Sequence, residues 1–148
     1  MQAAIGCAQL DKIDGFTKLR REHWEYLREN LKDLEDKLIL PEPEKGASPS
    51  WFGFLISVKE DAGFTRDELV EHLEKHNIQT RNLFSGNIIK HPCFDEYRED
   101  ENAYRVVGEL KNTDRIMNRT FWIGVYPEMT VPKLDYMIKM IRNFVTTV

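Results

Sequence analysis

The clearest strand in this sequence is the stretch Trp51-Phe52-Gly53-Phe54-Leu55-Ile56-Ser57-Val58. Because side chains of a strand alternate between the two faces of a sheet, four apolar side chains share one face here: Phe52, Phe54, Ile56 and Val58. Trp51 and Leu55 then lie on the other face. Apolar residues on both faces predict a strand that is covered on both sides.

Two more strands and several helices are predicted around this strand. The strands are Ile78–Phe84 and Phe121–Val125. The first two predicted helices cover residues 3–10 and 16–38. A third, short helix begins at the capping box Thr65-Arg66-Asp67-Glu68 and ends at Asn77. A fourth covers residues 112–117, and the last helix is capped by Thr130. This order predicts an α+β fold: a small, mainly antiparallel sheet with helices mostly on one side.

The first 40 residues are predicted to be helical, and residues 41–148 to form the α+β domain. Ala3 to Leu10 is small and apolar, so we expect this helix to be buried against a partner, such as an upstream domain. In the next helix an apolar stripe recurs every three or four residues: Phe16, Leu19, His23, Leu27, Leu31, Leu34 and Leu38. We interpret His23 as a packing residue at the edge of the core.

Composition excludes several classes of function. The 148 residues carry a formal net charge of -4, and no basic stripe is present, which argues against nucleic-acid binding. No segment is long and apolar enough for a membrane span or a signal peptide. The two cysteines, Cys7 and Cys93, have no metal-ligand spacing. We therefore expect a cytoplasmic protein with free thiols.

No self-contained active site is recognisable. Cys93 follows His91 by two residues across a proline, which does not make a catalytic triad. His72 and His76 lie one helical turn apart, a spacing that can bind metal, but no third ligand is suggested. There is no P-loop and no dinucleotide-binding glycine motif.

The most unusual segment is Thr80-Arg81-Asn82-Leu83-Phe84-Ser85-Gly86-Asn87. It combines a guanidinium, an aromatic ring and amides beside a glycine turn, which suits a phosphorylated or sugar ligand. A strand end with an ordinary turn is the alternative, and the residues leave both open. Tyr126 could also face a cleft, whereas Trp51 and Trp122 are more typical of a core.

Several segments in order resemble one protein family. These are Met1–Leu10 (Met-Gln-Ala-Ala-Ile-Gly-Cys-Ala-Gln-Leu), Ser50–Phe54, Thr80–Asn87, Asn112–Arg115 and Thr120–Pro127. Together they resemble the DegT/DnrJ/EryC1/StrS family of sugar aminotransferases. Within it they look like the branch of 3-dehydratases that act on nucleotide-linked 4-keto-6-deoxyhexoses in lipopolysaccharide synthesis, with CDP-4-keto-6-deoxyglucose as the nearest substrate.

The resemblance implies that this chain is the small C-terminal domain of a fold-type I enzyme that depends on vitamin B6. The cofactor would be pyridoxamine 5'-phosphate (or PLP), and a histidine upstream of Met1 would be the catalytic base. Some members also carry an iron–sulfur cluster upstream and work with a reductase, and the family forms homodimers. This chain alone would bind no cofactor, hold no catalytic residue and be inactive.

The resemblance also implies where substrate would lie. The segment Arg81–Asn87 matches the part that faces the active-site cleft, so Arg81, Phe84, Ser85, Gly86 and Asn87 are the predicted substrate-binding residues. A sugar aminotransferase of the same family is one alternative. A freestanding α+β interaction or regulatory module is another, and it predicts a stable monomer with no large exposed apolar patch.

Overall fold

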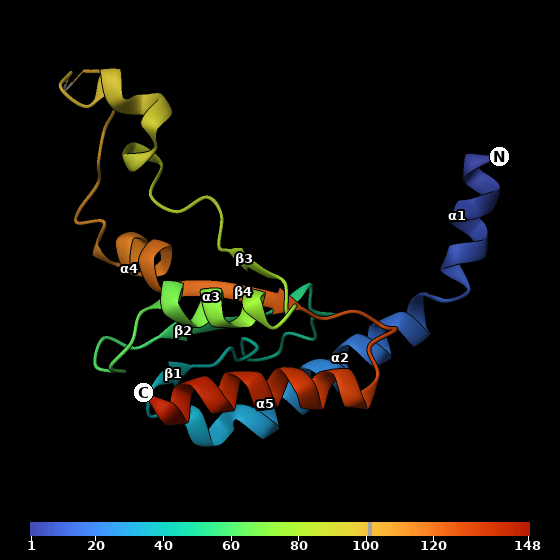
Figure 1. The fold of residues 1–148 in the computed structure, drawn as a ribbon. Coiled ribbons are helices and arrows are strands. Elements are labelled where there is room, and N and C mark those ends of the chain that lie inside the picture. The colour runs from blue at the N-terminus through green and yellow to red at the C-terminus, as the bar shows by residue number, and fades with distance from the viewer. Residues whose placement is uncertain (101) are drawn as a thin grey trace.

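The computed structural model describes residues 1–100 and 102–148 (Figure 1). In chain order its elements are α1 (Gln2–Leu10), α2 (Ile13–Leu31), the 3-10 turn η1 (Lys32–Leu34), β1 (Leu38–Ile39), β2 (Gly53–Val58), α3 (Arg66–Lys75), β3 (Thr80–Asn82), the 3-10 turns η2 (Ile88–Lys90) and η3 (Pro92–Tyr97), α4 (Lys111–Arg119), β4 (Thr120–Gly124) and α5 (Val131–Thr147). Among these residues, no helix is both long and apolar enough to span a bilayer.

The sheet has the strand order β1-β2-β4-β3, and every neighbouring pair is antiparallel. The prediction of an antiparallel α+β sheet is thus confirmed. The central pair is β2 and β4, with Leu55 opposite Trp122 and Ser57 opposite Thr120. Strands that are far apart in the sequence therefore meet at the middle of the sheet.

One face of the sheet, the inner face, is buried. Phe54 and Ile56 from β2 and Phe121 and Ile123 from β4 are at most 1% exposed. They belong to one apolar cluster with residues of α2, α3 and α5. Helices α2 and α5 contact each other, as do α3 and α5, and Figure 1 shows α2 and α5 running together beneath the sheet. The residues predicted to be buried in the last helix, Leu134, Met137, Ile138, Ile141 and Val145, are confirmed.

Local sequence signals set the limits of α3 as predicted. Thr65 and Glu68 form the complete capping box: the Thr65 side chain accepts from the Glu68 amide, and the Glu68 carboxylate accepts from the Thr65 amide at 2.7 Å. At the other end Asn77 has φ 58, the left-handed conformation that often follows a helix.

The long second helix ends earlier than predicted. The leucine spacing predicts a helix to Leu38, but α2 ends at Leu31, and Leu38 lies in β1 opposite Val58. Leu34 and Leu38 are nevertheless buried in the same core. The last two leucines of the stripe therefore reach the core from a 3-10 turn and from a two-residue strand. A strand of two residues shows no alternation of apolar and polar side chains, so the sequence could not predict it.

The predicted strand from Trp51 begins two residues later, at Gly53. Trp51 has φ 59, so the chain turns there before it becomes extended. The prediction that Phe52 shares the inner face with Phe54 is wrong, because Phe52 is 74% exposed. Phe54, Ile56 and Val58 lie inside as predicted.

Two segments project from the packed layers. Helix α1 buries no residue, and Figure 1 shows it standing away from the sheet. The second segment, which we term the excursion, comprises residues 88–100 and 102–110. Its turns η2 and η3 bury no residue either, and Figure 1 shows it rising from the sheet. Neither α1 nor these turns of the excursion contribute to the core, although Lys90 of the excursion pairs with Asp114 of α4.

Candidate functional site

The face of the sheet opposite the core, the outer face, is only partly covered: α4 contacts β2 and β4, whereas Arg81 and Gly124 are exposed. Directly opposite residues of antiparallel strands share a face, so Arg81, Trp122 and Leu55 form one row across β3, β4 and β2. Gly53 lies opposite Gly124 in the same layer. A Cβ on Gly53 would be 3.0 Å from the carbonyl oxygen of Ile123 and 3.2 Å from the Trp122 ring, so the glycine lets this ring approach the strand closely.

Three aromatic rings gather at this end of the outer face: Phe52, Phe84 and Trp122, which we term the aromatic cluster. The ring centre of Trp122 lies 4.8 Å from that of Phe52 and 5.6 Å from that of Phe84. Phe52 and Phe84 are 74% and 76% exposed. Two phenyl rings this exposed, both packed against Trp122, indicate a surface that receives a ligand or another part of a protein.

A hollow of about 1120 Å³ extends from the aromatic cluster to the start of α5. Its polar lining is basic or neutral: Arg20, Arg81 and Lys133 supply cations, and Tyr126 and Tyr136 supply hydroxyls. No Asp or Glu of residues 1–100 and 102–148 lines it. The hollow is large enough for an organic ligand of moderate size, and its charge favours an anionic one.

The position of Phe52 is fixed from beneath by α2. The guanidinium of Arg20 donates to the carbonyl oxygens of Trp51 at 2.6 Å and of Phe52 at 3.0 Å. The Trp51 ring stacks on that of Trp24 at 4.0 Å with an angle of 2° between the planes. These contacts stabilise the turn at Trp51. Because of this turn, the Phe52 side chain lies on the outer face.

The structure brings two of the predicted substrate-binding residues to the hollow, Arg81 and Phe84. Ser85 is exposed, and its carbonyl oxygen lies 2.5 Å from Nε2 of His91. Gly86 has φ 72, and a Cβ there would lie 2.7 Å from Cγ of Met117, so this position requires glycine.

Asn87, the fifth predicted residue, points into the protein. It is 2% exposed, and its Nδ2 donates to Oδ1 of Asp114 at 2.8 Å. Lys90 pairs with the other carboxylate oxygen of Asp114 at 2.9 Å. Hydrogen bonds from Asn87 and then Lys90 lower the pKa of Asp114. In this structure Asn87 therefore anchors the segment to α4, while Arg81 and Phe84 face the hollow.

Sequence reasoning missed Phe52 as a member of this site and placed Trp122 in the core. Tyr126, which the sequence leaves as a candidate to face a cleft, lines the hollow. The signal that could have identified the open face is the pair Gly53 and Gly124, since glycine within a strand often marks the close approach of another group.

Within residues 1–100 and 102–148 the other histidines and the cysteines do not gather into a metal site. Cys7 and Cys93 are free and exposed. The rings of His72 and His76 lie 4.3 Å apart, but the described part of the chain contains no group of three or more ligands that could hold a metal ion.

Comparison with known proteins identifies the fold and the family. The model of the DegT/DnrJ/EryC1/StrS aminotransferase family matches residues 1–142. The chain belongs to this family. It is 47% identical over 144 residues to the lipopolysaccharide biosynthesis protein RfbH of Salmonella typhimurium, covering 97% of this chain and 32% of RfbH. It is 47% identical over 145 residues to dTDP-4-dehydro-2,6-dideoxy-D-glucose 3-dehydratase of Saccharopolyspora spinosa, covering 98% and 30%.

A solved structure from the same family superposes on most of the chain. The E. coli GDP-4-keto-6-deoxy-D-mannose-3-dehydratase with bound hydrated PLP matches with a TM-score of 0.79 and 28% identity. The match covers 93% of this chain and 34% of that enzyme. The α+β fold is thus that of part of a PLP-dependent DegT-family enzyme, as predicted. The chain spans about a third of the length of the relatives it matches.

The described residues of this DegT-family chain do not by themselves fit a B6 cofactor, which the matched E. coli enzyme binds, or the iron–sulfur cluster that the resemblance implied. Within residues 1–100 and 102–148 the hollow has no carboxylate for the ring nitrogen of a B6 cofactor. An iron–sulfur cluster takes four thiolates, whereas the two cysteines lie on α1 and η3. No step of cofactor chemistry can therefore be assigned to residues of this chain.

Proposed function

We propose that this chain is the substrate-facing small domain of a B6-dependent dehydratase. The intact enzyme would remove the C3 hydroxyl of a nucleotide-linked 4-keto-6-deoxyhexose, with pyridoxamine 5'-phosphate as the cofactor. The observation that carries this proposal is the exposure of Arg81 and Phe84 on one basic, aromatic hollow. The 47% identity to a sugar 3-dehydratase supports the reaction class.

The hollow offers a ligand both charged groups and apolar surfaces. Arg81 is exposed. Its Nη1 donates to the neighbouring carbonyl of Thr80 at 3.0 Å, and its Nη2 donates to the amide oxygen of Gln79 at 2.8 Å. The guanidinium keeps further N–H groups, its Nε–H among them, for a phosphate. Phe84 and Phe52 offer ring faces against which a sugar or a base can pack. Lys133 adds a further cation, with its Nζ 5.9 Å from the centre of the Tyr126 ring. The cofactor, when bound in the intact enzyme, would supply the electron sink.

The test is an assay of the intact protein that carries this sequence, purified from its source cells. It is incubated with pyridoxamine 5'-phosphate and a nucleotide-linked 4-keto-6-deoxyhexose, and loss of water from the sugar is followed by mass spectrometry. We expect Arg81→Ala to reduce kcat/KM by about tenfold or more, because a charge-assisted contact is lost. Thermal stability should stay within about 1 kcal/mol, because Arg81 is exposed.

Lys139→Ala is the matched control, since Lys139 is an exposed cation on α5 that does not line the hollow. It should leave kcat/KM unchanged. Unchanged kcat/KM in Arg81→Ala, or a large loss of stability instead, would remove Arg81 from the substrate-binding set. Absence of dehydration by the wild-type protein would contradict the proposed reaction itself.

The alternative reaction is transfer of an amino group to the same kind of sugar, as expected from the name of the family. The assay distinguishes the two: an aminotransferase needs an amino-acid donor and yields an aminosugar, whereas the dehydratase yields a sugar lacking the C3 oxygen. A freestanding module is disfavoured, because that alternative predicts no large apolar patch, and Phe52, Phe84, Ile5 and Leu10 are all exposed.

The proposal extends to the surroundings of the intact enzyme. We propose that the intact enzyme is a homodimer and lies in the cytoplasm. We also propose that, where the purified enzyme contains iron and acid-labile sulfide, a reductase acts on the product of the dehydration. Light scattering, cell fractionation and iron analysis test these parts one at a time. A monomer would contradict the proposed dimer, and a membrane-bound protein would contradict the proposed location. A protein without iron would contradict the proposed reductase step. None of these results would change the outcome of the dehydratase assay.

We also propose that α1 packs on the remainder of a longer polypeptide. Ile5 and Leu10 of α1 are 60% and 63% exposed. An isolated helix of nine residues is marginal in water, so α1 needs a packing partner. The length of the relatives, about three times that of this chain, supports a partner from the same polypeptide.

A further inference from the structure

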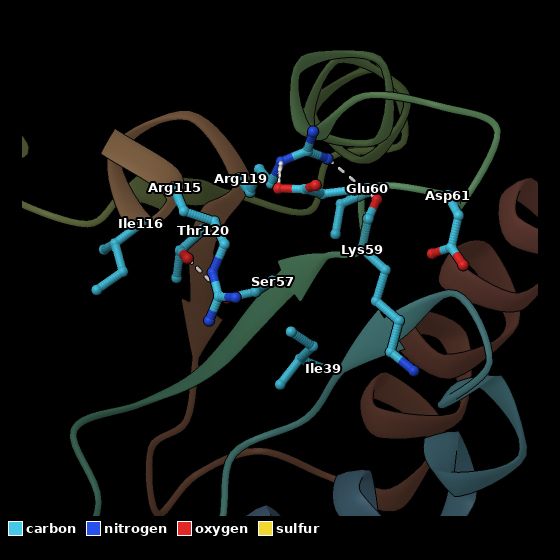
Figure 2. Close-up of a pocket in the computed structure, with 10 residues that line it drawn as sticks. Ile39, Ser57, Lys59, Glu60, Asp61, Arg115, Ile116, Arg119 and Thr120 are labelled. Atoms are coloured by element: carbon cyan, nitrogen blue, oxygen red, sulfur yellow. Dashed lines mark hydrogen bonds and ion pairs between the residues drawn. The ribbon is translucent and has the colours of Figure 1, made fainter. Parts of the chain in front are cut away.

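A second pocket lies at the other end of the outer face from the aromatic cluster. It has a volume of about 280 Å³ and is formed where β2 ends, β4 begins and α4 crosses them (Figure 2). Ser57 is four positions after Gly53 in β2, so the two sites are about 13 Å apart along this strand. No residue of this pocket lines the hollow described above.

The floor of this pocket is a pair of hydroxyl groups. Ser57 and Thr120 are directly opposite in the β2–β4 ladder, and their side-chain oxygens lie 2.6 Å apart. Thr120 is only 5% exposed. One hydroxyl donates to the other, so the accepting hydroxyl keeps its own hydrogen for a further acceptor. The floor can therefore donate a hydrogen bond to a bound anion.

Two arginines of α4 stand over this floor, Arg115 and Arg119. They are four residues apart, so they share one side of the helix, and like charges at this spacing repel each other. Arg119 is partly satisfied: its Nη1 donates to the carbonyl of Lys59 at 3.1 Å, and its Nε lies 3.8 Å from a Glu60 oxygen. Figure 2 shows Arg115 reaching down beside Ser57 and Thr120.

Arg115 makes no side-chain hydrogen bond or ion pair with the described residues. Asp114, the acid next to it, is already bound by Asn87 and Lys90. Figure 2 places Glu60 beside Arg119 and Asp61 across the pocket from Arg115. An unpaired guanidinium, aimed at a hydroxyl pair and beside a second arginine, has the donor arrangement that binds an oxyanion.

We propose that this pocket binds a small oxyanion, a phosphate or carboxylate group, between Arg115 and Arg119 and above the Ser57–Thr120 hydroxyl pair. Ile39 and Ile116 line the pocket as well and would contact a short apolar part of the ligand. The small volume excludes a whole nucleotide-linked sugar, so the site is separate from the proposed substrate cleft. The inference does not depend on the proposed dehydratase activity.

The experiment is a titration of the full 148-residue chain with inorganic phosphate, and separately with acetate, at constant ionic strength. Backbone amide signals of Ser57, Thr120 and Arg115 are followed by NMR. We expect these signals to shift and saturate. Arg115→Gln should weaken binding by about tenfold or more, because two charge-assisted hydrogen bonds are lost. The phosphate affinity of Arg115→Lys should lie between those of the wild type and Arg115→Gln, because lysine keeps the charge but not the planar pair of donors.

Lys18→Gln is the matched control: Lys18 is exposed on α2, pairs with Glu22 and lies outside the pocket. It removes the same charge and should bind phosphate as wild type does. Tighter binding of phosphate or of acetate identifies which oxyanion the site prefers. Absence of saturable shifts with both anions, or equal weakening in Arg115→Gln and Lys18→Gln, would overturn the proposal.

Discussion

Arg81 and Asn87 lie at the two ends of the segment Arg81–Asn87, one exposed to solvent and the other buried. Arg81 lies exposed in the row of the outer face, whereas the Asn87 amide is enclosed and held by Asp114 of α4. Replacing the two residues should therefore change different quantities. Loss of Arg81 should change ligand affinity, and loss of Asn87 should change the stability of the segment that carries Phe84.

We predict that Asn87→Ala lowers the free energy of unfolding by about 1–3 kcal/mol, because a buried amide contact is removed. Urea denaturation of the chain measures this. Asn82→Ala is the matched control: Asn82 is exposed on β3, and its replacement should change stability by no more than about 0.5 kcal/mol. Equal stability losses in the two variants would contradict an anchoring role for Asn87.

The sequence could not separate these two residues in advance. Arginine, phenylalanine and asparagine near a glycine turn suit a ligand site, and for Arg81 and Phe84 that environment is present. The burial of Asn87 depends on Asp114, 27 residues later in the chain. A contact between elements that far apart leaves no periodic signal in either segment.

Helices α3 and α5 meet around a pair of histidines. The His72 ring lies 4.3 Å from that of His76 and 5.1 Å from that of Phe144. Its Nε2 is shielded from solvent. Desolvation, and then the nearby His76, lower the pKa of His72, and the backbone of Met140 on α5 lies close enough to oppose this shift in part. Folding therefore favours the neutral form of His72.

This preference predicts a loss of stability in acid. The unfolded chain takes up the proton below about pH 6.5, whereas the folded chain does so only at lower pH, so stability falls as the pH drops through this window. We expect His72→Leu to show a smaller fall between about pH 7 and pH 5 in urea denaturation. His91→Gln, on the excursion, is the control. The same pH slope in wild type and His72→Leu would contradict this prediction.

Most elements were predictable because each carries its own local signal. The capping box at Thr65 and the apolar stripe of the last helix fix α3 and α5. β1 was not predictable, because Leu38 continues the leucine spacing of α2. The outward position of Phe52 was not predictable either, because it depends on the left-handed turn at Trp51, which Arg20 and Trp24 stabilise from another element.

At the scale of the whole molecule, α1 and the excursion leave the packed layers and expose apolar side chains. Ile5 and Leu10 belong to α1, and Phe94, Tyr97 and Val107 belong to the excursion. The core beneath the sheet is closed without either segment. Both are therefore available to pack against other protein, and α1 provides the sharper test because it is a regular helix.

We predict that Ile5→Glu makes the 148-residue chain more soluble and destabilises the longer protein that contains it. The charge prevents non-specific association in the first case and disrupts a buried contact in the second. Ala3→Glu, which lies about 160° around the helix from Ile5, is the control. Centrifugation of the chain and thermal unfolding of the longer protein give the two readouts. No effect of Ile5→Glu in both would contradict the packing of α1.

The stacked pair Trp24 and Trp51 has a consequence for fluorescence. The chain has three tryptophans. Two of them are held face to face at 4.0 Å within the folded layers, so their emission follows folding. The third, Trp122, lies in the aromatic cluster at the hollow. Light emitted from Trp122 should therefore change when a molecule settles against Phe52 and Phe84, and the protein carries its own optical probe for that event.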